Sequence, residues 1–157
     1  MRFKPADLLQ DSNVPLLLLP QNNRVEFTSD AKKQLDVWRS QDRIDLVEAA
    51  GEALSECMNA YSPYSKCPSG AAIVTHEGGI YSGGYIESAA YNPSMVPLQT
   101  AIVDAVIDGM PSYSTLKAAL LVELKHGAVQ HSKSMGVNVN QIAPDAEFKV
   151  LHVEWSV

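Results

Sequence analysis

Cysteine is scarce in this sequence. Of its 157 residues only Cys57 and Cys67 are cysteines, and none follows Cys67. The two thiols could pair only with each other, and the N-terminal residues lack the apolar core of a signal peptide. We therefore expect a cytosolic chain with two free thiols. A metal site that needs a cysteine pair in the C-terminal half is excluded.

Basic residues and long apolar runs are also few. The chain has 12 Lys and Arg against 18 Asp and Glu, a net charge of -6. A nucleic-acid partner held through its phosphates requires a basic face, so this balance argues against one. The longest apolar run, Val14 to Leu19, is too short to span a membrane, and Pro15 and Pro20 interrupt and bound it. The sequence predicts neither a nucleic-acid partner nor a membrane span.

What remains is the composition of one globular domain. Hydrophobic residues make up 46% of the chain and charged residues 19%. Residues 1–29 differ from the rest, because they hold three prolines and no sustained period. They are interpreted either as an extended connector that packs through Leu16 to Leu19, or as a short β-strand of the domain. Residues 30–157 are predicted to form the domain.

Helical spacing dominates the first part of that domain. A first helix is expected to end near Ser40, and Asp42 is a candidate cap for a second helix that runs to about Ala60. The apolar stripe of the second helix is predicted to contain Val47, Ala50, Leu54, Cys57 or Met58, and Tyr61. Glu48, Glu52 and Glu56 fall on another face, which we interpret as a solvated surface.

The period then changes to that of strands. "GAAIVTHEGGIYSGGYIE" predicts two strands joined by a tight turn at Gly78 and Gly79. Pro97 suits the first turn of a helix that Gly109 ends. The buried side of this helix is predicted to comprise Leu98, Ala101, Ile102, Ala105 and Val106. A central strand over Leu116 to Leu124, a weaker helix within residues 130–142 and a last strand "EFKVLHVEW" complete an α/β sandwich with a mixed sheet.

One stretch carries a family resemblance. "AYSPYSKCPSGAAIVTHEGGIYSGGYIESAAYNPSM" resembles the cytidine deaminase family in its PYS turn, its glycine-led strand, its hairpin and its Glu-bearing second strand. It is most similar to the C-terminal, zinc-less half of the two-domain enzymes of plants and enteric bacteria, and the opening "FKPADLLQDSNVPLLLLPQNN" is similar to the plant connector. The resemblance implies a three-layer α/β/α sandwich with a mixed sheet.

The resemblance also shows which chemistry is missing. Hydrolytic deamination needs a zinc-bound water and a carboxylate that shuttles a proton. The family positions of the first zinc ligand and the catalytic Glu are held here by Val96 and Leu98, and the later cysteine pair is absent. Three protein ligands are usual for catalytic zinc. We therefore expect no catalytic residue, no metal and no cofactor in this chain, with zinc confined to the catalytic domain of the family.

Substrate positions are partly lost as well. By the resemblance, the aromatic residue that lies against the base aligns with Cys67, and the Asn and Glu that bind the ribose align with Tyr85 and Glu87. Tyr85 and Glu87 are thus read as a vestigial ribose site, or Glu87 as a hydrogen-bonded structural residue at a strand end. The candidate substitute ligands or acid–base groups are Glu123 and the four histidines, His76, His126, His131 and His152. We interpret the histidines as surface or partly buried residues that share no site, and Glu123 as an ion-pair partner.

The elements retained point to a partner role. In the family, an Ala and a Tyr two apart reach into the neighbouring domain's site, and the matching residues here are Ala89 and Tyr91. The resemblance therefore implies a non-catalytic domain that supports a catalytic cytidine deaminase domain, or that forms a homodimer when alone.

Three alternatives to the partner role stay open. They are a free-standing pseudoenzyme with a nucleoside-binding or protein-interaction role, catalysis by unrecognised groups, and binding of single-stranded RNA, which the acidic balance disfavours.

Overall fold

One mixed sheet organises the part of the chain that this computed structural model describes, residues 22–90 and 93–156. Its five strands lie in the order β1-β5-β4-β2-β3. Only the contact between β4 and β5 is parallel. The strands are β1 (Val25–Phe27), β2 (Ser69–Thr75), β3 (Ile80–Gly84), β4 (Leu116–Leu124) and β5 (Glu147–Trp155).

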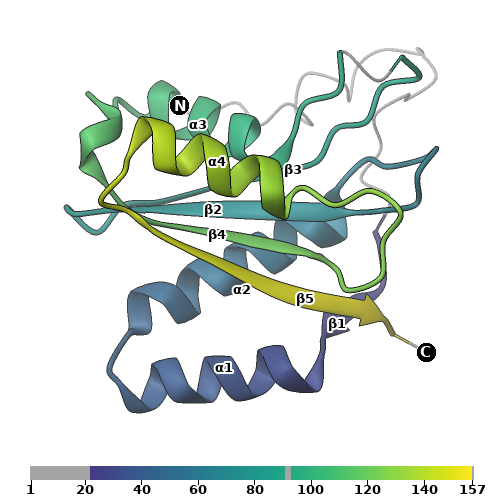
Figure 1. The fold of residues 1–157 in the computed structure, drawn as a ribbon, viewed down its shortest axis with the longest axis horizontal. Helices are drawn as coiled ribbons and strands as arrows, with labels where there is room; N and C mark the ends of the chain where they lie inside the picture. The colour runs from purple at the N-terminus through teal and green to yellow at the C-terminus, as the bar shows by residue number, and fades with distance from the viewer. Residues whose placement is uncertain (1–21, 91–92, 157) are drawn as a thin grey trace, which may run out of the picture.

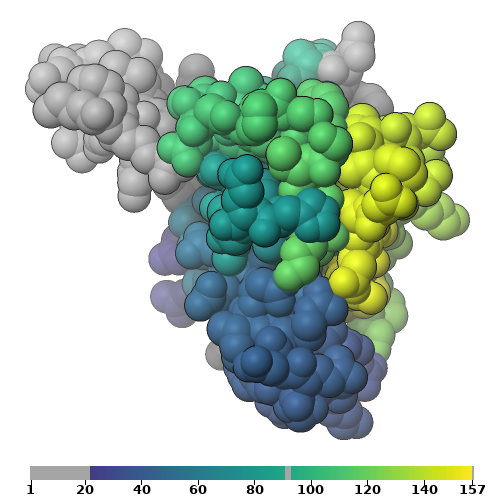
Figure 2. Space-filling model, turned by 90° about the vertical axis from the view of Figure 1, so that its left-hand side faces the viewer, coloured from purple at the N-terminus to yellow at the C-terminus, as the bar shows by residue number. Residues whose placement is uncertain are grey.

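Helices cover both faces of the sheet. The helices are α1 (Ser29–Ser40), α2 (Ile44–Asn59), α3 (Pro97–Ile107), α4 (Ser132–Ile142) and the short 3-10 turn η2 (Tyr113–Thr115). Figure 1 shows α1 and α2 on one side of the sheet and α3 and α4 on the other. Figure 2 shows the same layers end-on, with the blue α1 and α2 below the teal turn between β2 and β3, and green residues above it. The predicted α/β/α architecture with a mixed sheet is confirmed.

Two apolar clusters form the core, one on each face. The first joins α1 and α2 to the sheet, and the second joins α3 and α4 to it. Every residue of β2 is buried, and in β4 all residues but Lys117 are buried. This explains why the sequence of β4 is a continuous apolar run rather than an alternating one.

Two glycines allow the helices to approach the sheet closely. A Cβ at Gly70 would overlap the backbone of α2 at Ala53 and Cys57. A Cβ at Gly83 would overlap Thr100 and the backbone nitrogen of Ala101 in α3. These contacts hold α2 and α3 directly against β2 and β3.

Most element boundaries agree with the sequence analysis, but three details differ. Asp42 does not cap α2: it has a φ of 56°, and the N-cap is Arg43, without a side-chain bond. Val106 is 53% exposed, because the buried stripe of α3 runs through Leu98 and Ala101 to Ala105. The strand β1 lies within residues 1–29, where a short strand was one of two interpretations, but its position was not predicted, since three residues are too few to show alternation; Leu16 to Leu19 lie outside the described residues.

The predicted buried face of α2 also needs correction. Its fully buried positions are Leu46, Ala49, Ala50, Ala53 and Cys57, whereas Val47 and Leu54 pack only at the edge of the cluster. Cys57 and Cys67 are free and buried, as expected. Within residues 22–90 and 93–156, no helix is long and apolar enough to cross a membrane.

Candidate functional site

The N-terminus of α3 occupies the place where the resemblance puts the first metal ligand and the catalytic Glu. Val96 is the N-cap residue, and its backbone N–H donates to Oε1 of Gln99 at 3.2 Å. Leu98 is 3% exposed and belongs to the apolar cluster on the α3 and α4 face of the sheet. Leu98 therefore contributes packing, and neither the Leu98 nor the Val96 side chain can supply a metal ligand or a proton.

Zinc does not fit this set of residues. Zinc requires thiolate, imidazole or carboxylate ligands, normally three from the protein at a catalytic site. No group of three His, Cys, Asp or Glu residues among those described is arranged to hold a metal ion. Val96 and Leu98 have no donor atoms in their side chains, so no reaction step can be assigned to a metal at this position.

We expect the purified chain to hold far less than one zinc ion per chain after dialysis, because the donors that bind catalytic zinc are missing at α3. Elemental analysis of the dialysed protein measures this directly. Zinc close to one equivalent, retained against a weak chelator, would contradict the prediction.

A buried carboxylate caps the second helix of this face. Glu123, at the end of β4, is 1% exposed, and its Oε2 accepts a hydrogen bond from the backbone N–H of His131 at 2.7 Å. His131 is the N-cap residue of α4. A negative charge is stabilised by the free N–H groups and the dipole at a helix N-terminus. Glu123 thus acts on the protein's own backbone, and the prediction that it is an ion-pair partner is replaced by a helix-capping role.

The ring of His131 packs against Tyr85, which follows β3. Their centroids lie 4.6 Å apart with the planes tilted by 57°, and both residues are buried. Burial lowers the pKa of His131, although the charges of Glu123 and Glu87 act in the opposite direction. The imidazole is therefore neutral at neutral pH. Tyr85, predicted as part of a vestigial ribose site, is 1% exposed and lies inside the protein.

Cys67 aligns with the aromatic residue that lies against the cytosine ring in the family, but here its thiol contacts other parts of the protein. Its Sγ donates to the carbonyl of Ser65 at 3.3 Å and accepts from the N–H of Val129 at 3.4 Å. The thiol is 4% exposed. Cys67 therefore links the PYS turn to the loop before α4.

Glu87 uses both carboxylate oxygens within the chain. Oε2 accepts from the backbone N–H groups of Tyr64 and Ser65 at 2.8 and 3.0 Å, and Oε1 accepts from Ser65 at 3.3 Å. These bonds give Glu87 a structural role in holding the PYS turn. A role toward a ribose stays a prediction.

Ala89 and Ala90 lie at the surface. Ala89 is exposed, and Tyr91 lies outside the described residues. Exposed apolar side chains flank this loop: Tyr64 is 62%, Ile86 39% and Met95 37% exposed, and Ile86 and Met95 form a β-bridge. The loop that carries Ala89 therefore emerges from an apolar part of the surface.

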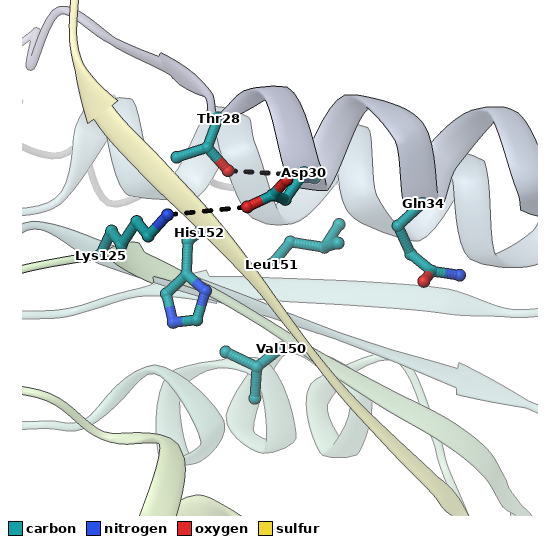
Figure 3. Close-up of a pocket in the computed structure, with 8 residues that line it drawn as sticks. Thr28, Asp30, Gln34, Lys125, Val150, Leu151 and His152 are labelled. Carbon is teal, nitrogen blue, oxygen red and sulfur yellow. Dashed lines mark hydrogen bonds and ion pairs between the residues drawn. The ribbon is translucent and has the colours of Figure 1, made fainter.

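A separate pocket lies between α1 and β5. Its volume is about 220 Å³, and Figure 3 shows Thr28 and Asp30 at the start of α1 beside His152 of β5. Lys125 Nζ lies 3.6 Å from Asp30 Oδ2, and Thr28 Oγ1 accepts from the N–H of Ala31 at 3.3 Å. Of the candidate site residues in the sequence analysis only His152 lines this pocket, and neither the family's zinc and Glu positions nor its ribose positions do. The pocket lies between α1 and β5, away from the start of α3 where the resemblance places the deaminase site.

The histidines do not gather at one place. His76 and His126 are exposed and His152 is half-buried, whereas His131 is buried beside Glu123. The sequence pattern points to His131 and Glu123 only as separate residues and does not single out Ser69. The pairing of β2 with β4 could have indicated Ser69, because it lies opposite Glu123.

Comparison with known proteins finds similarity to cytidine deaminases. Residues 1–135 match the family described as "Cytidine and deoxycytidylate deaminase zinc-binding region". The chain is 38% identical over 152 residues to Cytidine deaminase 1 of Arabidopsis thaliana, which covers 96% of this chain and 48% of that relative. It is 36% identical over 141 residues to Probable inactive cytidine deaminase 4 of the same plant, which covers 89% of this chain and 55% of that protein.

Among solved structures, the fold is also similar to that of a cytidine deaminase. The crystal structure of cytidine deaminase from Burkholderia pseudomallei superposes with a TM-score of 0.56 and 25% identity, over 68% of this chain and 87% of that one. The chain spans about half the length of the curated relatives it matches.

Proposed function

Because the chain belongs to the cytidine deaminase family, we propose that it is a non-catalytic domain that pairs with a catalytic cytidine deaminase domain and helps to close that domain's nucleoside site. The parent activity would be the hydrolysis of cytidine or deoxycytidine to uridine or deoxyuridine. The observation that supports this most is Leu98. It lies in the core at the position where the resemblance expects the catalytic Glu, while the loop with Ala89 is exposed.

The length of the relatives is consistent with a paired arrangement. Cytidine deaminase 1 of Arabidopsis thaliana is about twice as long as the stretch it shares with this chain. That protein thus has room for a second domain of similar size. We propose that this chain corresponds to its zinc-less half.

The molecular surface offers places for a partner. Aliphatic residues on one side of α3 are exposed, namely Val103, Val106 and Ile107 at 46%, 53% and 77%. They follow the i, i+3, i+4 spacing of one helix face. Together with Tyr64, Ile86 and Met95 around the Ala89 loop, they provide apolar area of the kind that protein interfaces bury.

We expect the isolated chain to self-associate, most simply as a homodimer, because a domain that normally buries these surfaces against a partner leaves them exposed when alone. Sedimentation velocity at tens of micromolar measures the mass. Replacing Ile107 by Ser should shift the equilibrium toward monomer, whereas replacing Val137 by Ser, at a residue of α4 that is 62% exposed, should not. A wild-type chain that sediments only as a monomer would argue against the prediction.

Tyr91 provides the test of the role in trans. In a mixture of this chain with a catalytic cytidine deaminase domain, Tyr91→Phe is expected to raise the KM for cytidine by the equivalent of one hydrogen bond, about 0.5–1.5 kcal/mol. The melting temperature of the variant should hardly change, since the ring is retained.

The matched control is Tyr64→Phe, which removes the hydroxyl of an exposed tyrosine whose backbone N–H binds Glu87, two residues before Ala89. It should leave the KM unchanged. If Tyr91→Phe instead lowers the melting temperature and leaves the KM as it was, Tyr91 is a packing residue and the proposed trans role is wrong.

A second candidate function is a free-standing pseudoenzyme with a nucleoside-binding or protein-interaction role. The name of the relative Probable inactive cytidine deaminase 4 favours it. The burial of Tyr85 and the internal bonds of Glu87 argue against its nucleoside-binding form, because neither group is presented to a ligand. Titration with cytidine, followed by calorimetry on the chain alone, separates this candidate from the first.

A further inference from the structure

Four residues form a closed ring of contacts between the sheet and α4. Ser69 of β2 lies opposite Glu123 of β4, and Glu123 binds the backbone of His131. His131 packs on the ring of Tyr85, and the Tyr85 backbone N–H returns to the carbonyl of Ser69 at 2.9 Å. Each residue therefore contacts the next, and the side chains of Ser69 and Glu123 project from the same face of the sheet because paired residues share a side.

Three polar atoms of this ring have no hydrogen-bond partner in the described part of the chain. They are Ser69 Oγ, Glu123 Oε1 and His131 Nε2. Ser69 and Glu123 are 1% exposed and His131 is 6% exposed, so bulk solvent does not satisfy them. A buried polar atom without a partner is costly, and buried unpaired groups in native proteins commonly bind an internal water.

The bonding capacity of the three atoms narrows the class of ligand. Glu123 Oε1 accepts only, when the carboxylate is ionised, and the Ser69 hydroxyl can donate. Neutral His131 offers one accepting ring nitrogen. A water molecule donates twice and accepts from a third group, which matches this set. A metal ion would need a third His, Cys, Asp or Glu, and the described residues provide no such group.

We propose that the ring of Ser69, Tyr85, Glu123 and His131 binds one internal water molecule. The water donates to Glu123 Oε1 and His131 Nε2 and accepts from the hydroxyl of Ser69, while Tyr85 packs on the imidazole. It connects the start of α4 to the paired ends of β2 and β4.

The first test is a crystal structure of the wild-type chain, at a resolution that orders internal waters. We expect one isolated density peak at about 2.6–3.2 Å from all three atoms. A ring closed by a direct bond between Ser69 and Glu123, without a peak, would overturn the proposal. So would a peak at about 2.0–2.2 Å from His131 Nε2 and Glu123, since that is a metal-ligand distance.

The second test works in solution. Nuclear Overhauser spectra of the labelled wild-type chain should show cross-peaks from a long-lived water to ring protons of His131. Ser69→Ala removes one of the three water contacts, so these cross-peaks should be lost or strongly weakened. The matched control is Ser62→Ala, because Ser62 Oγ is also buried and without a hydrogen-bond partner among the described residues, but Ser62 lies outside the strand pairing of Ser69 with Glu123.

The outcomes of the solution test are distinct. Loss of the cross-peaks in Ser69→Ala together with their retention in Ser62→Ala supports the proposal. Equal spectra for Ser69→Ala and the wild type contradict it. If Ser69→Ala does not fold, the wild-type spectrum decides alone, because a chain without long-lived water at His131 does not bind one there.

Discussion

Replacing Leu98 by Glu is expected to lower the free energy of unfolding by about 3–5 kcal/mol, the range for an uncompensated charge in a protein interior. The resemblance places the catalytic Glu of the family at this position. In this chain the side chain is 3% exposed and packs in an apolar cluster that includes Ala71, Leu121 and Met135. An ionised carboxylate there would have no metal and no basic partner within that cluster. Urea unfolding followed by circular dichroism measures the change.

Two controls separate burial of charge from other effects of the substitution. Leu98→Met conserves volume and polarity and should cost less than about 1.5 kcal/mol. Val103→Glu adds the same charge to the same helix at a residue that is 46% exposed, and should change stability by about 0.5 kcal/mol or less. If Leu98→Glu is as stable as Leu98→Met, the position is not a packed core site and the account of a filled active site is wrong.

The isolated chain is expected to form no uridine from cytidine above the uncatalysed rate, which corresponds to a loss of at least about 10⁶-fold against a typical enzyme. Deamination requires an activated water and a proton shuttle, and the side chains at the start of α3 are Val96 and Leu98. The carboxylate of Glu123 is buried, and its Oε2 accepts from the backbone N–H at the start of α4.

A chromatographic assay with a zinc-bearing family member as positive control, such as the Burkholderia pseudomallei enzyme, measures this rate. Uridine that forms in proportion to the concentration of this chain, and that persists through two unrelated purification schemes, would contradict the prediction.

The fold was largely predictable because its main elements have strong periods. The β4 run is continuously apolar as a strand covered on both faces requires, and Gly78, with a φ of 88°, supplies the turn between β2 and β3. The buried face of α2 was predicted in part: Ala50 and Cys57 are buried as expected, but Leu46, Ala49 and Ala53 were missed, and Val47 and Leu54 lie at the edge of the cluster. Small side chains give a weak hydrophobic signal even where the packing is tightest.

The candidate site was predictable only where a residue's type decides the chemistry. Val96 and Leu98 cannot bind metal in any fold, so the sequence sufficed for them. The cap that Glu123 provides for α4 depends on how the loop after β4 returns to the sheet. The ring with Ser69 and Tyr85 depends on strand register and on a loop contact. Such arrangements join residues distant in the sequence, and no local pattern encodes them.

The most direct test of the paired role is the kcat/KM for cytidine of a catalytic domain as this chain is added to it. The half of Arabidopsis thaliana Cytidine deaminase 1 that this chain does not match is the natural partner to use. We predict a saturable rise in kcat/KM, with co-sedimentation of the two chains at the same stoichiometry. A rate that stays constant at every concentration of this chain, with the two proteins sedimenting separately, would contradict the proposal that it is the partner half of a deaminase.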